Sequence, residues 1–218
     1  MSEDEYMDLN RIEMSVQELL TEMKDISEVI VDLAYAALVY NSKEMGNRVN
    51  ELEDEMEELK YAIRVKALLA AGTLEDAKQL SGILQIASAA DRISHAAGDL
   101  VDLLDVPADK RPFITNLINE SDEKIRMIRI SPASEMAGYT IGKLGVEANT
   151  GMKIIALKNR YGWTYDPEDD VKLRAGDDMI VRGTEDGGNR LAQFASGKLP
   201  WEWDEEEEQE EEDVANEE

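Results

Sequence analysis

The chain of 218 residues contains no cysteine, so disulfides, thiolate metal sites and cysteine nucleophiles are excluded. Aromatic residues make up only 6% of it, and one histidine leaves little material for general acid–base catalysis. The most apolar stretch, 29–40, contains Asp32 and falls short of the ~20 residues that span a bilayer. The N-terminal stretch 1–11 is acidic where a secretory signal is basic and then apolar. We therefore expect a cytoplasmic protein without direct membrane insertion.

Basic residues are also scarce, because 23 lysines and arginines face 49 acids and the net charge is -26. Such a surface repels phosphate backbones and anionic lipids, which predicts that the protein does not bind nucleic acid. A dense acidic surface is also typical of proteins in a very salty cytoplasm, where it would report on the cell and not on the function. The sequence has no G-x-S-x-G motif, P-loop or G-x-G-x-x-G after a strand, so we expect no enzyme.

Apolar residues in the first half repeat at spacings of three and four over three stretches, which predicts three helices that pack along shared seams. The first seam consists of Leu9, Ile12, Val16, Leu19, Met23, Ile26, Ile30, Leu33 and Ala37. The second consists of Met45, Val49, Leu52, Met56, Leu59 and Ile63. The third consists of Ile83, Ile86, Ala90, Ile93, Ala97, Leu100 and Leu104. Because the connections are short, an antiparallel three-helix bundle follows.

Residues at the ends of these stretches predict where the helices begin and stop. Asn41 with Glu44 and Thr73 with Asp76 have the form of capping boxes at the starts of the second and third helices. Gly72 is expected to end the second helix in a left-handed conformation.

The second half changes from a helical to an extended period, with short apolar runs between glycines and prolines. Strands are expected at 125–130, 152–158, 163–165, 171–173 and 179–182, with helices at 136–144 and 188–194 and a turn at 183–188. The predicted fold class is therefore α+β, a helical bundle followed by a small mixed domain. The predicted domains are 1–106, a connector 107–124 with a helix at 113–118, 125–198, and a disordered acidic tail 199–218.

An ordered set of residues recurs along the second half: Ser134, Ala137, Gly138, Ile141, Leu144, Gly151, Ile154, Ile155, Ala156, Pro167, Leu173, Gly176, Asp177, Ile180 and Gly183. In this order and spacing they resemble the RCK C-terminal (TrkA-C) domain. The resemblance implies a cytosolic module that pairs as a homodimer and senses a small ligand for a potassium or other cation transporter. Locally, Gly176 and Asp177 also suit a turn that leads into an apolar strand.

In some members of that family, the resemblance implies cyclic di-AMP or a related cyclic dinucleotide held between two protomers. Ile154, Ile155 and Pro167 would pack on the base, and Asn159 and Arg160 are candidates for the phosphate or the base edges. Ile154 and Ile155 would equally suit a buried central strand, and both roles are compatible at a dimer interface.

Residues 86–96 (IASAADRISHA) resemble the third helix of a PhoU-like domain. In that family an acidic pair four residues apart binds metal, and here Asp91, His95 and Asp99 stand at i, i+4 and i+8. They are the candidate ligands for a divalent metal ion, on a helix face that we expect to point away from the seam. Histidine replaces the second acid of the family, so a solvated acidic face with a surface histidine is the alternative.

Trp201 and Trp203 flank Glu202 just before the acidic tail. Such aromatics either clasp the parent domain or dock a partner, and we expect the clasp.

The two resemblances together predict a regulatory subunit that senses a small ligand, a cyclic dinucleotide or an ion, and controls a separately encoded cation transporter or channel. The alternative is a PhoU-like metal-binding or phosphate-signalling protein that its C-terminal domain dimerises. A structural adaptor without a ligand also fits the sequence.

Overall fold

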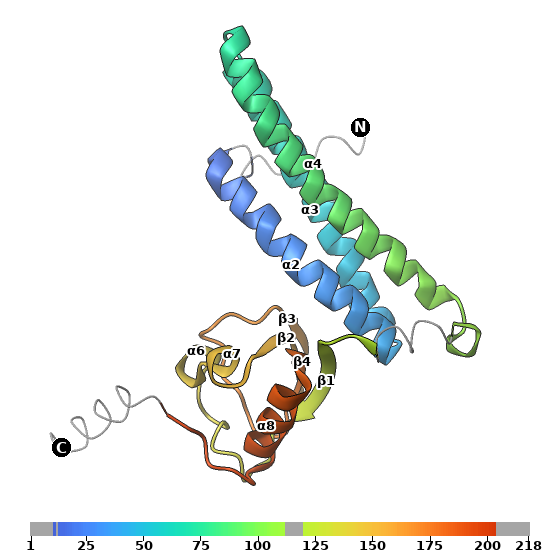
Figure 1. Ribbon diagram of the computed structural model, residues 1–218, viewed down its shortest axis with the longest axis vertical. Coiled ribbons are helices and arrows are strands. Elements are labelled where there is room, and N and C mark those ends of the chain that lie inside the picture. The colour runs from blue at the N-terminus through green and yellow to red at the C-terminus, as the bar shows by residue number, and fades with distance from the viewer. Residues whose placement is uncertain (1–10, 12, 112–119, 204–218) are drawn as a thin grey trace, which may run out of the picture. The chain divides into compact units, whose positions relative to one another are not determined.

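A computed structural model describes residues 11, 13–111 and 120–203 (Figure 1). The chain divides into two compact units, Met1–Asn116 and Leu117–Glu218. Within the described residues, no helix combines the length and the apolar character that a membrane span requires.

The N-terminal unit is built from three long helices that lie side by side (Figure 1). These are α2 (Val16–Tyr40), α3 (Lys43–Ala70) and α4 (Leu74–Asp102), and α4 is followed by the short 3-10 helices η2 (Leu103–Asp105) and η3 (Ala108–Lys110). Successive helices run antiparallel, and α3 and α4 extend beyond the start of α2. The predicted three-helix bundle is confirmed.

The helix ends agree with the sequence at one corner and differ at the other. Thr73 and Asp76 form the predicted capping box of α4. At the α2–α3 corner, however, Asn41 takes a left-handed φ of 48° to end α2, and the Ser42 side chain accepts a hydrogen bond from the Met45 amide to begin α3. The predicted Asn41–Glu44 box is therefore wrong, because α3 follows α2 so closely that Asn41 must turn the chain. Arg111, which is buried, donates to the Asn41 Oδ1 at the same corner.

The other predicted terminus is also corrected. Helix α3 ends at Ala70, and Gly72 is not in the left-handed region.

The packed faces of α2 and α3 follow the predicted seams. On α2, Leu19, Met23, Ile26, Ile30, Leu33 and Ala37 are buried, and all six predicted residues of α3 are buried. Val16 is half-buried, and Leu9 and Ile12 lie outside the described residues.

The third seam is right only in part. Its member Ala97 is buried, and Ile83, Ala90, Leu100 and Leu104 are half-buried, but Ile86 is 60% exposed and Ile93 42% exposed. The packed face of α4 consists of Ala87, Asp91, Ser94, Ala97, Gly98 and Val101. These small residues let α4 approach α3 closely: a Cβ added at Gly98 would lie 2.2 Å from the Glu53 side chain. The helix is therefore turned by about one residue, ~100°, from the predicted orientation.

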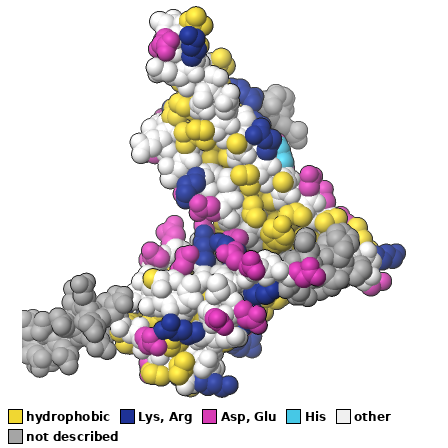
Figure 2. All heavy atoms as spheres, in the orientation of Figure 1, with side chains coloured by type: hydrophobic (Ala, Val, Ile, Leu, Met, Phe, Trp, Pro, Cys, Tyr) yellow, Lys and Arg dark blue, Asp and Glu magenta, His cyan; other side chains and the backbone are white. Residues whose placement is uncertain are grey.

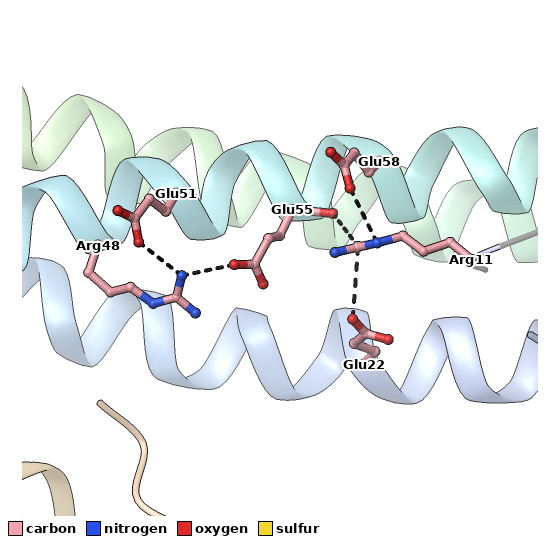
Figure 3. Close-up of polar contacts among 6 residues, drawn as sticks. All are labelled: Arg11, Glu22, Arg48, Glu51, Glu55 and Glu58. Carbon is pink, nitrogen blue, oxygen red and sulfur yellow. Dashed lines mark hydrogen bonds and ion pairs between the residues drawn. The ribbon is translucent and has the colours of Figure 1, made fainter. Parts of the chain in front are cut away.

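Two arginines balance part of the acidic α3 surface where it lies beside α2 (Figure 3). Arg48 pairs with Glu51 and Glu55 along α3, at 3.1 and 2.8 Å. Arg11 donates to the Glu55 carbonyl at 3.0 Å, and its Nε lies 3.2 Å from Glu58. Arg11 thereby holds the chain just before α2 against the middle of α3.

The C-terminal unit contains a four-stranded antiparallel sheet in the order β1-β4-β2-β3. Its strands are β1 (Lys124–Arg129), β2 (Met152–Asn159), β3 (Gly162–Tyr165) and β4 (Asp178–Gly183). Four of the five expected strands are confirmed. The fifth, 171–173, supplies only an isolated bridge between Lys172 and Thr140. The α+β fold class is confirmed.

The helices of this unit depart from the prediction in two places. Instead of one helix at 136–144 there are two short ones, α6 (Ile141–Leu144) and α7 (Val146–Thr150), with Gly145 left-handed between them. The expected turn at 183–188 is wrong, because Thr184 caps the start of α8 (Glu185–Ser196). A Cβ at Gly187 would lie 2.2 Å from the Thr150 carbonyl oxygen, so this glycine lets α8 pack closely on α7.

The core of the C-terminal unit includes the two tryptophans near the acidic tail. Trp201 is 5% exposed and its ring centroid lies 4.8 Å from that of Phe194 on α8. Trp203 meets Tyr139 edge to face at 4.7 Å. The predicted clasp is confirmed, and residues 199–203 therefore belong to the domain and not to a disordered tail. Both 204–218 and the helix expected at 113–118 lie outside the described residues.

Candidate functional site

A cleft of about 250 Å³ opens in the C-terminal unit between α6, α7, β2 and the loop after β3. Lys153 and Ile154 reach it from β2, and Asp166, Pro167 and Asp169 reach it from the loop. The remaining lining residues are Ile141, Gly142, Gly145, Val146, Glu147 and Ala148.

Two backbone hydrogen bonds fix the loop that forms one wall of the cleft. The Asp166 amide donates to the Ile155 carbonyl at 2.8 Å, and the Gly142 amide donates to the Asp169 carbonyl, also at 2.8 Å. Asp166 has a φ of 44°, so the chain turns sharply before Pro167. A Cβ at Gly142 would lie 2.8 Å from the Asp169 Cβ, which shows how closely α6 approaches the loop.

The cleft combines apolar surface with charge of both signs. Ile154 and Pro167 offer apolar contact, while the Lys153 ammonium lies 3.9 Å from the Asp166 carboxylate. Glu147 and Asp169 add two more carboxylates. Such a site can pack against a flat ring, accept hydrogen bonds from amino groups and hold one anionic group at Lys153.

The structure brings together some of the predicted ligand residues and separates others. Ile154 and Pro167 both line the cleft. Ile155 is 1% exposed at a bulge of β2 and does not line it, which favours the buried-strand alternative for this residue. Asn159 and Arg160 lie at the β2–β3 turn, away from the cleft lining.

At that turn, both polar candidates already have local partners. The Tyr161 amide donates to the Asn159 Oδ1 at 2.7 Å. The Arg160 guanidinium donates to the Tyr161 hydroxyl and lies 4.6 Å from the centroid of its ring. These contacts stabilise the turn.

Lys153, Asp166 and Asp169 line the cleft but were not predicted as site residues. Lys153 immediately precedes Ile154, and Asp166 immediately precedes Pro167, so adjacency to the predicted residues was a usable signal for both. Asp169 reaches the cleft only because its carbonyl holds the Gly142 amide, and no local motif marks that contact.

The candidate metal residues lie in the N-terminal unit, and their orientation differs from the prediction. Asp91 is 4% exposed, and its Oδ2 lies 2.6 Å from the Lys60 Nζ on α3. His95 is hydrogen-bonded through Nδ1 to Glu53, also on α3. Asp91 and His95 thus face α3 instead of pointing away from the packed face, whereas Asp99 is exposed. Within 11, 13–111 and 120–203, no group of three His, Asp or Glu side chains is arranged to hold a metal ion.

Carboxylates around His95 favour its charged form. The hydrogen bond that the imidazole donates to Glu53 raises the pKa of His95, and the nearby charges of Asp91 and Glu57 act in the same direction. His95 Nε2 lies 3.7 Å from Asp91 Oδ1 and 3.8 Å from Glu57 Oε1. The ring bridges α3 and α4 most strongly when it is protonated.

This arrangement predicts a pH-dependent contribution to stability. Because the folded pKa is raised above the ordinary value of 6.5, the contribution is fully present below pH 6.5 and is lost as the pH rises through the folded value. We expect His95→Gln to lower the free energy of unfolding by less than ~1 kcal/mol, since the side chain is 44% exposed, and only on the acidic side. Urea unfolding of the unsubstituted protein and of His95→Gln, at pH values below and above 6.5, measures this difference in the free energy of unfolding. A difference that does not change with pH would contradict the prediction.

The two units define a chain in which a helical bundle is joined to a small α+β domain with a ligand-sized cleft. Residues 20–104 match the family model of the PhoU domain, and residues 125–196 match that of the TrkA-C domain. The chain therefore combines a PhoU domain with a TrkA-C domain. No curated protein matches the chain.

Several solved structures are similar to parts of the chain. The RCK_C domain dimer of S. agalactiae BusR in complex with c-di-AMP is 28% identical over 32% of this chain and 92% of that chain, with a TM-score of 0.31. The RCK C domain of the potassium transport protein KtrA in complex with c-di-AMP is 26% identical over 39% and 96%, with a TM-score of 0.32. S. agalactiae BusR in complex with its busAB-promotor DNA is 16% identical over 77% and 96%, with a TM-score of 0.33.

Proposed function

We propose that this protein is a cytoplasmic, non-enzymatic regulatory subunit for a separately encoded potassium or other cation transporter. Its TrkA-C domain would bind a small ligand and pair with a second copy, and its PhoU domain would pass the bound state on. The observation that carries the proposal is the cleft of about 250 Å³ built from Lys153, Ile154 and Pro167, inside the residues that match the TrkA-C domain.

The chemistry of the cleft supports a ligand with both a flat ring and an anionic group. Ile154 and Pro167 can pack against a base, and Lys153 can pair with a phosphate. Asp166 and Asp169 can accept hydrogen bonds from the amino groups of a base. A cyclic dinucleotide such as cyclic di-AMP has all three features. An ion is the alternative ligand, because three carboxylates line the same cleft.

Calorimetric titration of the full chain with cyclic di-AMP in high-potassium buffer tests the proposal. We expect Lys153→Gln to weaken binding by ~10-fold or more, because it removes a charge-assisted hydrogen bond to phosphate. Lys158→Gln is the matched control, since Lys158 lies on the same strand and its ammonium sits over Trp163, outside the cleft. Arg160→Gln should likewise leave the affinity unchanged.

Two outcomes would contradict this function in different ways. If Lys153→Gln and Lys158→Gln lower the affinity for cyclic di-AMP equally, the ligand does not bind in the cleft. Absence of binding by cyclic di-AMP, other nucleotides and divalent ions would remove the sensing role altogether.

A further inference from the structure

Helix α4 has a second apolar face, which lies beside its packed residues. This outer stripe consists of Gly82, Ile86, Ala89, Ile93, Ala96 and Leu100. Its members are exposed or half-buried, and Ile86 is 60% exposed. Figure 2 shows hydrophobic side chains along the helical unit where Figure 1 draws α2 and α4 next to each other, with few acidic side chains among them.

The spacing of the outer stripe is that of a coiled-coil seam. Successive members lie four, three, four, three and four residues apart, so they stay on one side of α4 over 19 residues of the helix (82–100). A seam of this kind is matched by another helix with the same repeat. The packed face of α4 contacts α2 and α3. In the outer stripe, Ile86, Ile93 and Ala96 stay exposed within the described residues.

The order of small and large residues along the stripe is self-complementary. Gly82, Ala89 and Ala96 alternate with the larger Ile86, Ile93 and Leu100. When two copies of the stripe run antiparallel with all six layers in register, residue 82 faces 100, 86 faces 96 and 89 faces 93. Every layer then pairs a small residue with a large one, which fills space evenly and lets the two helices approach closely.

Charge also favours a second copy of this chain as the occupant. The chain carries a net charge of -26, which opposes contact between most pairs of its surfaces, yet residues 79–90 contain no charged residue.

We propose that two copies of this protein associate through the outer stripes of α4, packed antiparallel. This interface lies in the PhoU domain and is separate from any pairing of the TrkA-C domains.

Because the chain has no cysteine, single substitutions can map the interface in the full-length protein. With a short bismaleimide, Ala89→Cys should give ~10-fold more covalent dimer than Gly82→Cys, because two residues 82 in the antiparallel pair are ~27 Å apart along the axis at 1.5 Å per residue. A Cβ at Gly82 meets nothing within 4 Å, so this control is not strained. Leu69→Cys, 81% exposed, reports random collision.

A second set of variants tests the stripe itself. Ile86→Glu with Ile93→Glu in the Ala89→Cys background should reduce the crosslinked product ~10-fold or more, because four carboxylates, two from each copy, would be buried in the contact. Leu68→Glu with Leu69→Glu is the matched control, with two exposed leucines changed off the stripe. Far-UV circular dichroism checks that both remain helical. If Ala89→Cys gives no more covalent dimer than Leu69→Cys, the proposal is overturned. If Gly82→Cys and Ala89→Cys give equal amounts of covalent dimer, the antiparallel arrangement is overturned.

Discussion

Replacing Trp201 by alanine is expected to lower the free energy of unfolding of the TrkA-C domain by about 3–5 kcal/mol. This residue stands only three positions before the acidic run that begins at Asp204, yet it is 5% exposed and packs against Phe194. Its amide also donates to the Glu135 carboxylate at 2.8 Å, which fixes the chain where the tryptophan enters the core. Truncation would leave a cavity beside α8.

Tryptophan fluorescence can follow this unfolding alone, since all three tryptophans of the chain lie in the C-terminal unit. Leu199→Ala, at a position 37% exposed, is the matched control and should cost well under 1 kcal/mol. Trp201→Phe should cost less than the alanine variant, because the indole Nε1 has no hydrogen-bond partner among the described residues to lose. If Trp201→Ala lowers the free energy of unfolding by as little as Leu199→Ala does, the packing of Trp201 does not stabilise the domain.

Replacing Lys60 by methionine should destabilise the PhoU domain by about 2–4 kcal/mol. Asp91 is 4% exposed, and Lys60 Nζ lies 2.6 Å from its Oδ2, while its Oδ1 has no hydrogen-bond partner among the described residues. Without Lys60, a carboxylate inside the packed face of α4 would lose the nearest of its charged partners among the described residues. The Lys60 side chain is 25% exposed, so water would recover part of the cost.

Lys24→Met is the control for Lys60→Met, because Lys24 pairs with Glu28 on the solvent side of α2 with 63% of its side chain exposed. We expect no measurable loss of stability there, because water screens this exposed ion pair. Adding Asp91→Leu to Lys60→Met should restore most of the stability, since both charges are then removed together. Urea unfolding followed by far-UV circular dichroism measures all three variants. If Lys60→Met and Lys24→Met lower the free energy of unfolding by similar amounts, the Lys60–Asp91 pair does not stabilise the fold as a buried ion pair.

The helices show where sequence patterns succeed and where they fail. On α2 and α3 the packed faces are made of large aliphatic residues, so their spacing identifies them directly. On α4 the packed face is made of Ala87, Ser94 and Gly98 with Asp91, and the larger Ile86 and Ile93 lie outside. A search for hydrophobic periodicity favours the isoleucines, because it does not register close packing through small residues or a buried ion pair.

The cleft could be predicted only in part, for a topological reason. Ile154 and Pro167 follow from the resemblance to the TrkA-C domain. The walls come from α6 and α7, which have four and five residues and are too short to show a helical period. The polar candidates Asn159 and Arg160 follow Ile154 closely in sequence. They do not line the cleft, because β2 is extended and its far end lies several residues beyond the part that lines the cleft.

The contact between Arg111 and Asn41 ties the chain that follows α4 back to the bundle. Arg111 is 4% exposed, and it holds this part of the chain at the α2–α3 corner. A force transmitted through the connector would therefore enter the bundle at that corner. Helix α3 is 28 residues long, or ~42 Å at 1.5 Å per residue. The bundle would then act as a lever, and a rotation of about 5° at the corner would move the turn between α3 and α4 by about 4 Å over that length.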